Sequence, residues 1–155
     1  MVIFCTRCWA PNPPEAKTCL HCGAPLEPTK GEFVEKLISA LRHPEPGTVQ
    51  LAAWILGEQE EARAVPALIE LLKRSVEPGA LEAAVEALGK IGDASAVDVL
   101  ATSGHQWPLR VRLRVAETLK HIGGPRAKEA LSAMLEDRSG SVKAAAQAAL
   151  ELSEE

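Results

Sequence analysis

The chain of 155 residues contains no tyrosine and only two phenylalanines and three tryptophans. Aromatic and β-branched residues are those that β-strands favour, so their scarcity argues against a sheet-rich core. Alanine and leucine, both strong helix formers, are the commonest residues. The composition therefore predicts an all-α protein.

No stretch approaches the roughly 20 apolar residues of a membrane-spanning helix. The first residues, Met1 to Phe4, include neither the basic segment nor the apolar run of a secretory signal. The formal net charge is −4, which leaves no general basic footprint for a nucleic acid. We expect a cytoplasmic protein that does not bind membranes.

No cysteine follows residue 22, and the four that occur form two pairs, Cys5-x2-Cys8 and Cys19-x2-Cys22. Each C-x2-C turn places two thiolates on one side of the backbone, and two such turns supply the four sulfurs that Zn2+ takes at about 2.3 Å. So short a segment cannot bury a core of its own. We predict one structural zinc ion, whose four thiolates leave no open position for metal-hydroxide catalysis.

Disulfides, a redox pair and an iron site are the alternatives for these cysteines. Disulfides need an oxidising compartment. A redox C-x-x-C is expected once, at a strand-to-helix junction, and not twice in a proline-rich loop. Zinc is thus favoured, and iron or redox use stays open. His21 lies between two of the predicted ligands, and we expect it to face solvent.

Residues 3–26 resemble the short zinc-ribbon family common at the termini of prokaryotic proteins. Its pattern reads C-x-x-C-G, an Asn-Pro turn, a small residue, then C-x-x-C-G and a leucine. The matching positions are Asn12-Pro13, Ala16, Gly23 and Leu26. Trp9 departs from the pattern, since it stands where the family prefers the glycine of a left-handed turn. The resemblance implies a zinc-ribbon domain, for which we set the limits 1–29.

The rest of the sequence, residues 30–155, repeats with a period of 31 or 32 residues. The repeated leucines are Leu56, Leu88, Leu119 and Leu150. One helical turn before each of them stand Ala52, Ala84, Val115 and Ala146. Such a period is typical of stacked helical hairpins that complete one another's cores. We predict four hairpins with all four leucines buried.

Proline and glycine positions set the expected helix limits. The first helices of the hairpins are expected over 31–42, 62–74, 94–103 and 125–136. The second helices are expected over 48–57, 79–91, 108–122 and 140–152.

Segments 83–93, 96–100 and 111–123 resemble HEAT-type repeats of the subgroup named after phycobilisome lyases. The pattern is V-R-x-x-A-x-x-A-L-G-x-I-G-D followed by A-V-x-x-L, and it fits the second and third repeats well. The resemblance implies an α-solenoid of about four HEAT-like hairpins behind the zinc ribbon. It also implies that Arg112, the arginine of the pattern, ties adjacent repeats by hydrogen bonds. No residue set in the chain specifies the bilin attachment of a few members.

In such solenoids the second helices line the concave face. Trp54, Glu86 and Glu117 occupy equivalent repeat positions there. An exposed Trp54 would serve as a binding anchor, and the alternative is that the ribbon or its linker covers it. Arg110 and Arg114 share one helix side and could hold a phosphate or an acidic partner, unless nearby glutamates neutralise them.

No catalytic triad, phosphate loop or buried carboxylate pair can be assembled, so we expect no enzyme and identify no small-molecule substrate. The leading hypothesis is a non-enzymatic adaptor that binds another protein along the concave face. The candidate contact residues are Trp54, Glu86, Arg110, Arg114, Glu117 and His121. The alternatives are a nucleic-acid-associated module, which would use the ribbon and the two arginines, and a lyase-like accessory factor.

Overall fold

The computed structural model describes residues 2–5, 7–8, 10–26 and 30–152. The chain separates into two compact units, Met1–Lys36 and Leu37–Glu155. Among the described residues there are eight α-helices, three short 3-10 turns and one two-stranded sheet. The prediction of an all-α repeat fold is confirmed. The unit division falls inside the first helix, and the domain limits 1–29 and 30–155 stay a prediction.

The N-terminal unit contains two small hairpins, each of which carries one C-x2-C turn. In the first, β1 (Ile3–Phe4) pairs antiparallel with β2 (Pro11–Asn12). In the second, Thr18 and Pro25 form an isolated antiparallel bridge. Cysteine sulfurs, rather than a layer of large apolar side chains, lie at the centre of this unit, where Cys5 and Cys19 are buried.

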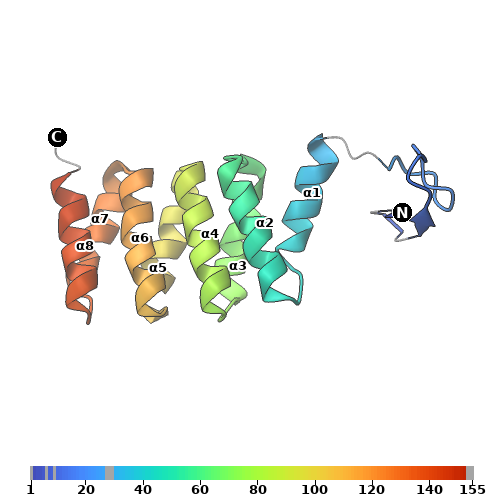
Figure 1. Cartoon of the computed structure of the whole chain (residues 1–155). Coiled ribbons are helices and arrows are strands. Elements are labelled where there is room, and N and C mark those ends of the chain that lie inside the picture. The colour runs from blue at the N-terminus through green and yellow to red at the C-terminus, as the bar shows by residue number, and fades with distance from the viewer. Residues whose placement is uncertain (1, 6, 9, 27–29, 153–155) are drawn as a thin grey trace. The chain divides into compact units, whose positions relative to one another are not determined.

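The helices alternate as the repeat period predicts (Figure 1). The first helices of the four hairpins are α1 (Lys30–Ala40), α3 (Val65–Arg74), α5 (Val97–Ser103) and α7 (Gly124–Met134). The second helices are α2 (Pro46–Glu58), α4 (Pro78–Ile91), α6 (Leu109–Ile122) and α8 (Gly140–Glu151). The 3-10 turns, η1 to η3, are Ala62–Ala64, Ala94–Ala96 and Gly104–Gln106.

Two second helices begin earlier than expected, because their prolines are inside the first turn and not ahead of it. Glu45 and Glu77 are the N-caps of α2 and α4, and their carboxylates accept hydrogen bonds from the first free backbone N–H groups. The Ala80 N–H is the main cause of the lowered pKa of Glu77. A proline suits the position after the cap because it has no N–H to satisfy.

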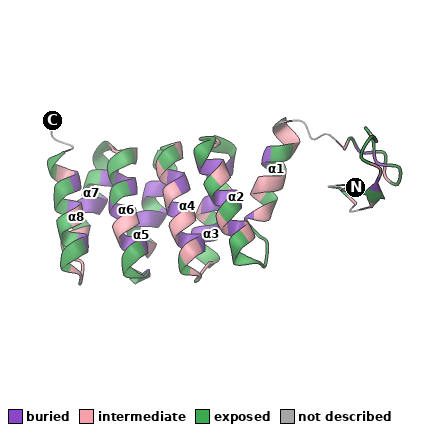
Figure 2. Ribbon diagram, in the orientation of Figure 1, coloured by how far each residue is buried: buried purple, intermediate pink, exposed green. Residues whose placement is uncertain are grey.

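Within the unit Leu37–Glu155 the helices form two layers. Helices α2, α4, α6 and α8 pack side by side, and α3, α5 and α7 form the second layer behind them (Figure 1). Buried residues lie where the layers and successive hairpins face each other, and the outward sides are exposed (Figure 2). Each hairpin therefore buries its apolar side against its neighbours, as stacked repeats require.

The seam between the second helices combines small residues with leucines. The seam residues that are buried are Ala52, Ala84, Val115, Ala146, Leu56, Leu88 and Leu119. Leu150 is only half-buried, so the prediction that all four leucines are buried was wrong at this position. Leu150 belongs to α8, on which no further described helix packs.

The second helices approach each other closely at Gly57. A Cβ atom on Gly57 of α2 would lie 2.8 Å from the Cα atom of Ala87 on α4, a distance that side-chain atoms do not tolerate. The hydroxyl of Thr118 on α6 donates to the carbonyl of Val85 on α4 at 3.1 Å. Small residues and one buried hydroxyl thus set the spacing of this layer.

A buried ion pair connects the third and fourth hairpins. The Arg112 guanidinium of α6 donates from Nε to Asp137 Oδ2 at 2.9 Å, and from a terminal nitrogen to the Trp107 carbonyl at 2.8 Å. The side chains of Arg112 and Asp137 are only 4% and 7% exposed. Asp137 lies between α7 and α8, so the prediction that Arg112 ties adjacent repeats is confirmed.

The length and polarity of the described helices indicate whether any of them could cross a membrane. None of them combines the length and the apolar character that crossing a bilayer requires.

Leu88→Ala is predicted to lower the free energy of unfolding by roughly 2–5 kcal/mol, because it opens a cavity in a fully packed seam. Leu150→Ala should cost clearly less, because its side chain is already half-exposed. Urea unfolding followed by circular dichroism measures both values. Equal costs would contradict a linear stack in which an interior repeat has more neighbours than α8.

Asp137→Asn is predicted to cost about 3–5 kcal/mol at neutral pH, because it leaves the buried Arg112 without its counter-charge. Burial raises the pKa of the Asp137 carboxyl, but the Ser139 N–H and Arg112 together hold it below its ordinary value. A lowered folded-state pKa means that this stabilisation is complete above about pH 4 and is lost as pH falls through the folded-state value. The difference between wild type and variant should therefore shrink in acid.

Asp98→Asn is the matched control for this experiment. Asp98 pairs with Arg126 at 2.6 Å, but both side chains are exposed. Its loss should cost at most about 1 kcal/mol. If the two variants unfold at the same urea concentration, the buried pair does not tie the repeats.

Candidate functional site

The four cysteine sulfurs converge at one point of the N-terminal unit. All four Sγ atoms lie within 4.8 Å of one another. The Cys5–Cys22 and Cys8–Cys19 sulfur pairs are 3.7 and 3.6 Å apart. A tetrahedron with Zn–S bonds of about 2.3 Å has edges of about 3.8 Å, whereas a disulfide bond measures about 2.05 Å. The cluster therefore fits a zinc site, and its cysteines are free thiols.

Backbone N–H groups point at two of the sulfurs in the same way. The N–H of Arg7 donates to Cys5 Sγ, and the N–H of His21 donates to Cys19 Sγ, both at 3.4 Å. Hydrogen bonds from the backbone of Cys22 and His21 lower the pKa of Cys19 to about 6. Those from Cys8 and Arg7 also lower the pKa of Cys5. These contacts favour the thiolate, which is the form that a metal binds.

The cluster does not ionise completely by itself. A backbone N–H from Ala10 lowers the pKa of Cys8, but burial and the neighbouring cysteines outweigh it and raise this pKa to about 12. Negative charges this close together repel each other, and a divalent cation at their centre removes that obstacle. The donor set thus suits a cation that prefers thiolates, as zinc does.

Asn12 connects the two cysteine turns, a role that the sequence analysis did not foresee. Its amide is buried and donates to the Ala10 carbonyl at 2.7 Å and to Cys19 Sγ at 3.6 Å. Its carbonyl oxygen accepts from the N–H of Leu20 at 2.9 Å. The available signal was that Asn12 is the chain's only asparagine and lies on the zinc-ribbon pattern.

The remaining expectations for this segment concern residues beside the ligands. His21 is exposed, as expected. Gly23, which follows the second C-x2-C pair, has a φ of +71°, the left-handed conformation that favours glycine. Trp9 occupies the corresponding position after the first pair and lies outside the described residues.

The candidate contact residues of the repeat unit lie together on α2, α4 and α6. We define the second-helix face as the surface formed by Trp54, Glu86, Lys90, Arg110, Arg114, Glu117 and His121. One groove is lined in part by Trp54, Glu86 and Lys90. The next shares Glu86 and Lys90 and adds Arg114, Glu117 and His121, and a third joins Arg110 to Arg114. Because neighbouring grooves share residues, they form one continuous surface.

Ion pairs connect the helices across this face. Lys90 on α4 pairs with Glu58 on α2 and with Glu86, at 3.1 Å, on its own helix. The hydrogen bonds that Lys90 donates to Glu58 and then to Glu86 raise the pKa of Lys90. Arg114 on α6 lies 2.8 Å from Glu117 and 3.9 Å from Glu86. The charges of neighbouring repeats therefore largely neutralise one another.

The two arginines considered for phosphate binding are included in this network. Glu82 on α4 lies 3.4 Å from Arg110 and 3.6 Å from Arg114. An incoming phosphate would have to compete with this carboxylate for both guanidinium groups. The neutralisation by glutamates that was considered from the sequence is confirmed.

Two large apolar side chains of α2 are exposed on one side of that helix. Trp54 is 53% exposed and Leu51, one turn earlier, is 58% exposed. Residues three apart lie on the same side of a helix. Trp54 is thus exposed within the repeat unit, and both readings of it, a binding anchor and a residue covered by the ribbon, stay predictions.

Comparison with protein families agrees with both parts of the chain. Residues 4–26 match the zinc-ribbon domain. Residues 34–108 match HEAT repeats, and residues 111–137 match PBS lyase HEAT-like repeats. None of the curated proteins compared with the chain matches it. The two resemblances identified in the sequence are confirmed.

Purified protein from zinc-replete cultures is predicted to contain about one zinc ion per chain, measured by elemental analysis. Cys19→Ser should lose the metal and unfold residues 3–26, because metal binding supplies the folding free energy of such a segment. Most of the helical circular dichroism should survive. His21→Ala, which alters an exposed neighbour of two ligands, is the control and should keep the zinc. Metal-free wild type would remove the zinc assignment.

Proposed function

We propose that this zinc-ribbon and HEAT-repeat protein is a non-enzymatic adaptor that binds another protein along its second-helix face. HEAT repeats indicate an interaction scaffold, and stacked repeats offer an extended binding surface without a closed pocket. The proposal assigns the contacts to Trp54, Glu86, Arg110, Arg114, Glu117 and His121.

The observation that carries this proposal is the exposed pair Leu51 and Trp54. Tryptophan is enriched among the residues that dominate binding energy, because it combines a large apolar area with a polar N–H group. Trp54 also borders the groove that contains Gly57 and Ala87. A partner that covers the indole therefore also contacts this groove.

The charged part of the face forms a polar rim around this anchor. Its ion pairs are partly exposed, so they give little stability individually. Charges in this position instead favour partners with a complementary pattern and exclude others. We infer a partner that covers Trp54 with apolar side chains and meets the mixed charges of α4 and α6 with polar ones.

The zinc ribbon has a structural part in this proposal. We assign Zn2+ to Cys5, Cys8, Cys19 and Cys22, which fit its ligand number and spacing. Such an ion supplies folding free energy and, with four thiolates, no catalytic position. A reducing compartment keeps such thiols available, and we therefore place the protein in the cytoplasm.

The two alternatives have less support. Nucleic-acid binding would rely on Arg110 and Arg114, whose guanidinium groups already pair with Glu82. A lyase-like accessory role rests on the family match of residues 111–137, and no catalytic residue set accompanies that match. Neither alternative has a feature comparable to the exposed Trp54.

Trp54→Ala is predicted to abolish capture of the partner from lysate of the native host by the tagged full-length chain. For a partner identified with wild type, the Kd should rise roughly 30-fold, the effect of losing about 2 kcal/mol at an anchor residue. Val76→Ala is the matched control: it also truncates an apolar side chain, 91% exposed, but it precedes α4 and does not line the second-helix face.

An equal Kd for Trp54→Ala and wild type would refute the proposed anchor. Nuclease-sensitive capture, with an affinity that falls steeply with salt and is lost in Arg110→Ala/Arg114→Ala, would favour the nucleic-acid alternative.

A further inference from the structure

One repeat position holds leucine in three hairpins and glycine in the remaining one. The residues, spaced by 31 or 32, are Leu41, Leu72, Gly104 and Leu135. Leu41 and Leu72 are fully buried, and Leu135 is half-buried. At this position the third hairpin alone has no side chain beyond Cα.

The backbone does not require glycine at this position. Gly104 has φ −57° and ψ −34°, ordinary right-handed values that every residue adopts. A Cβ atom there would meet Val115 Cγ1 at 3.7 Å and Trp107 Cε3 at 3.9 Å, which are normal packing distances. Gly104 is thus explained neither by conformation nor by a close approach of two backbones.

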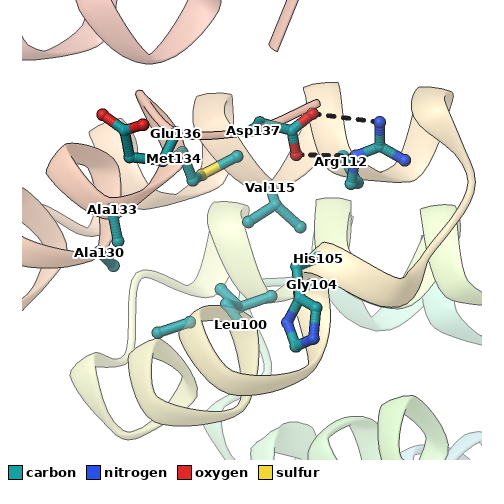
Figure 3. Close-up of a pocket in the computed structure, with 11 residues that line it drawn as sticks. Leu100, Gly104, His105, Arg112, Val115, Ala130, Ala133, Met134, Glu136 and Asp137 are labelled. Atoms are coloured by element: carbon teal, nitrogen blue, oxygen red, sulfur yellow. Dashed lines mark hydrogen bonds and ion pairs between the residues drawn. The ribbon is translucent and has the colours of Figure 1, made fainter. Parts of the chain in front are cut away.

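A cavity of about 230 Å³ lies beside Gly104, between α5, α6 and α7. Figure 3 shows Leu100, Val115 and Met134 arranged around it, with Gly104 on the α5 side. We call it the third-repeat cavity. A cavity of about 150 Å³ with aliphatic and aromatic walls already holds a benzene molecule. The third-repeat cavity is therefore large enough for a branched aliphatic group.

The cavity is open to solvent, and its edge is polar. Four of its lining residues are exposed: Ala101, His105, Ala133 and Glu136. The Arg112 guanidinium at its wall is held by Asp137 and by the Trp107 carbonyl, so it is not available to a ligand. The exposed Glu136 carboxylate leaves the edge suited to a positive charge.

We propose that the third-repeat cavity receives a leucine-sized aliphatic side chain of a partner polypeptide, with a cationic group beside it at Glu136. Leucine is the side chain that the chain carries at the three equivalent repeat positions. The cavity lies in the layer of α5 and α7 and shares no residue with the second-helix face. This site is therefore independent of the proposed adaptor surface.

The test uses L-leucinamide, which carries an isobutyl group and a cationic amine, as the probe on the full-length chain. Met134 lines the cavity, and Met1 is the only other methionine. Methyl-13C methionine labelling thus gives one NMR signal that reports on the cavity, assigned with Met134→Leu. We expect leucinamide to shift this signal with a Kd on the order of millimolar, as suits so small a ligand. Glycinamide, which lacks the isobutyl group, should not shift it.

Two variants fill the cavity from opposite sides. Gly104→Leu restores the side chain of the other repeats, and Ala133→Leu approaches from α7; both should abolish the leucinamide shift. Circular dichroism shows whether each variant folds. If one of them does not fold, the other still tests the proposal. Glu136→Gln should weaken leucinamide about two- to fivefold, the effect of one exposed charge pair. Glu129→Gln, on α7 and outside the cavity, is its control.

Each outcome decides a part of the proposal. No shift of the Met134 signal in the wild type, or an equal shift with glycinamide, would overturn it. An unchanged shift in a folded cavity-filling variant would place binding elsewhere and overturn it as well. If N-acetyl-leucinamide, which has no cationic amine, binds as tightly as leucinamide, the cationic half of the proposal is wrong.

Discussion

A single helical hairpin of about 30 residues cannot bury its apolar side, and every other feature of the repeat unit follows from this constraint. The hairpins have to stack, and the second helices must then pack closely over their whole length. Gly57 lies against Ala87, and Ala52 and Ala84 precede the buried Leu56 and Leu88 by one turn. Because the inner residues fix the register, outward residues one period apart come to lie beside each other. Trp54 and Glu86 border the same groove for this reason.

Periodicity made most of the fold predictable. A period of 31 or 32 residues identifies equivalent positions without any knowledge of the backbone, and proline positions add the helix limits. The predictions that were wrong depend on local contacts, which the repeat period does not specify. The start of α2 depends on the capping contacts of Glu45, and the burial of Leu150 depends on how many helices pack on α8. Both are matters of local contact and not of repeat position.

The candidate sites were predictable to different degrees. The metal site could be predicted from the spacing of the four cysteines alone, because thiol chemistry limits what such a cluster can bind. Asn12 was missed because a buried amide that links two turns has no sequence signature beyond its family position. Arg112 was expected to join neighbouring repeats, but Asp137 could not be named as its partner, since it lies 25 residues further along, outside the regular part of the repeat. Pairings across repeats require the three-dimensional register.

Gly57 and Gly104 show how the same residue type can have opposite meanings in one fold. At Gly57 a side chain would collide with the backbone of Ala87, so the packing of α2 on α4 accounts for the glycine completely. At Gly104 a Cβ atom would meet only ordinary contacts, and three other hairpins carry leucine. Large-to-small changes in a packed interior normally reduce stability, because they leave unfilled volume. The repeat fold therefore gives a reason for the first glycine and a penalty for the second. At Gly104 the unfilled volume lowers stability, and the packing of the helices does not require it. This is why we interpret the volume beside Gly104 as a binding cavity.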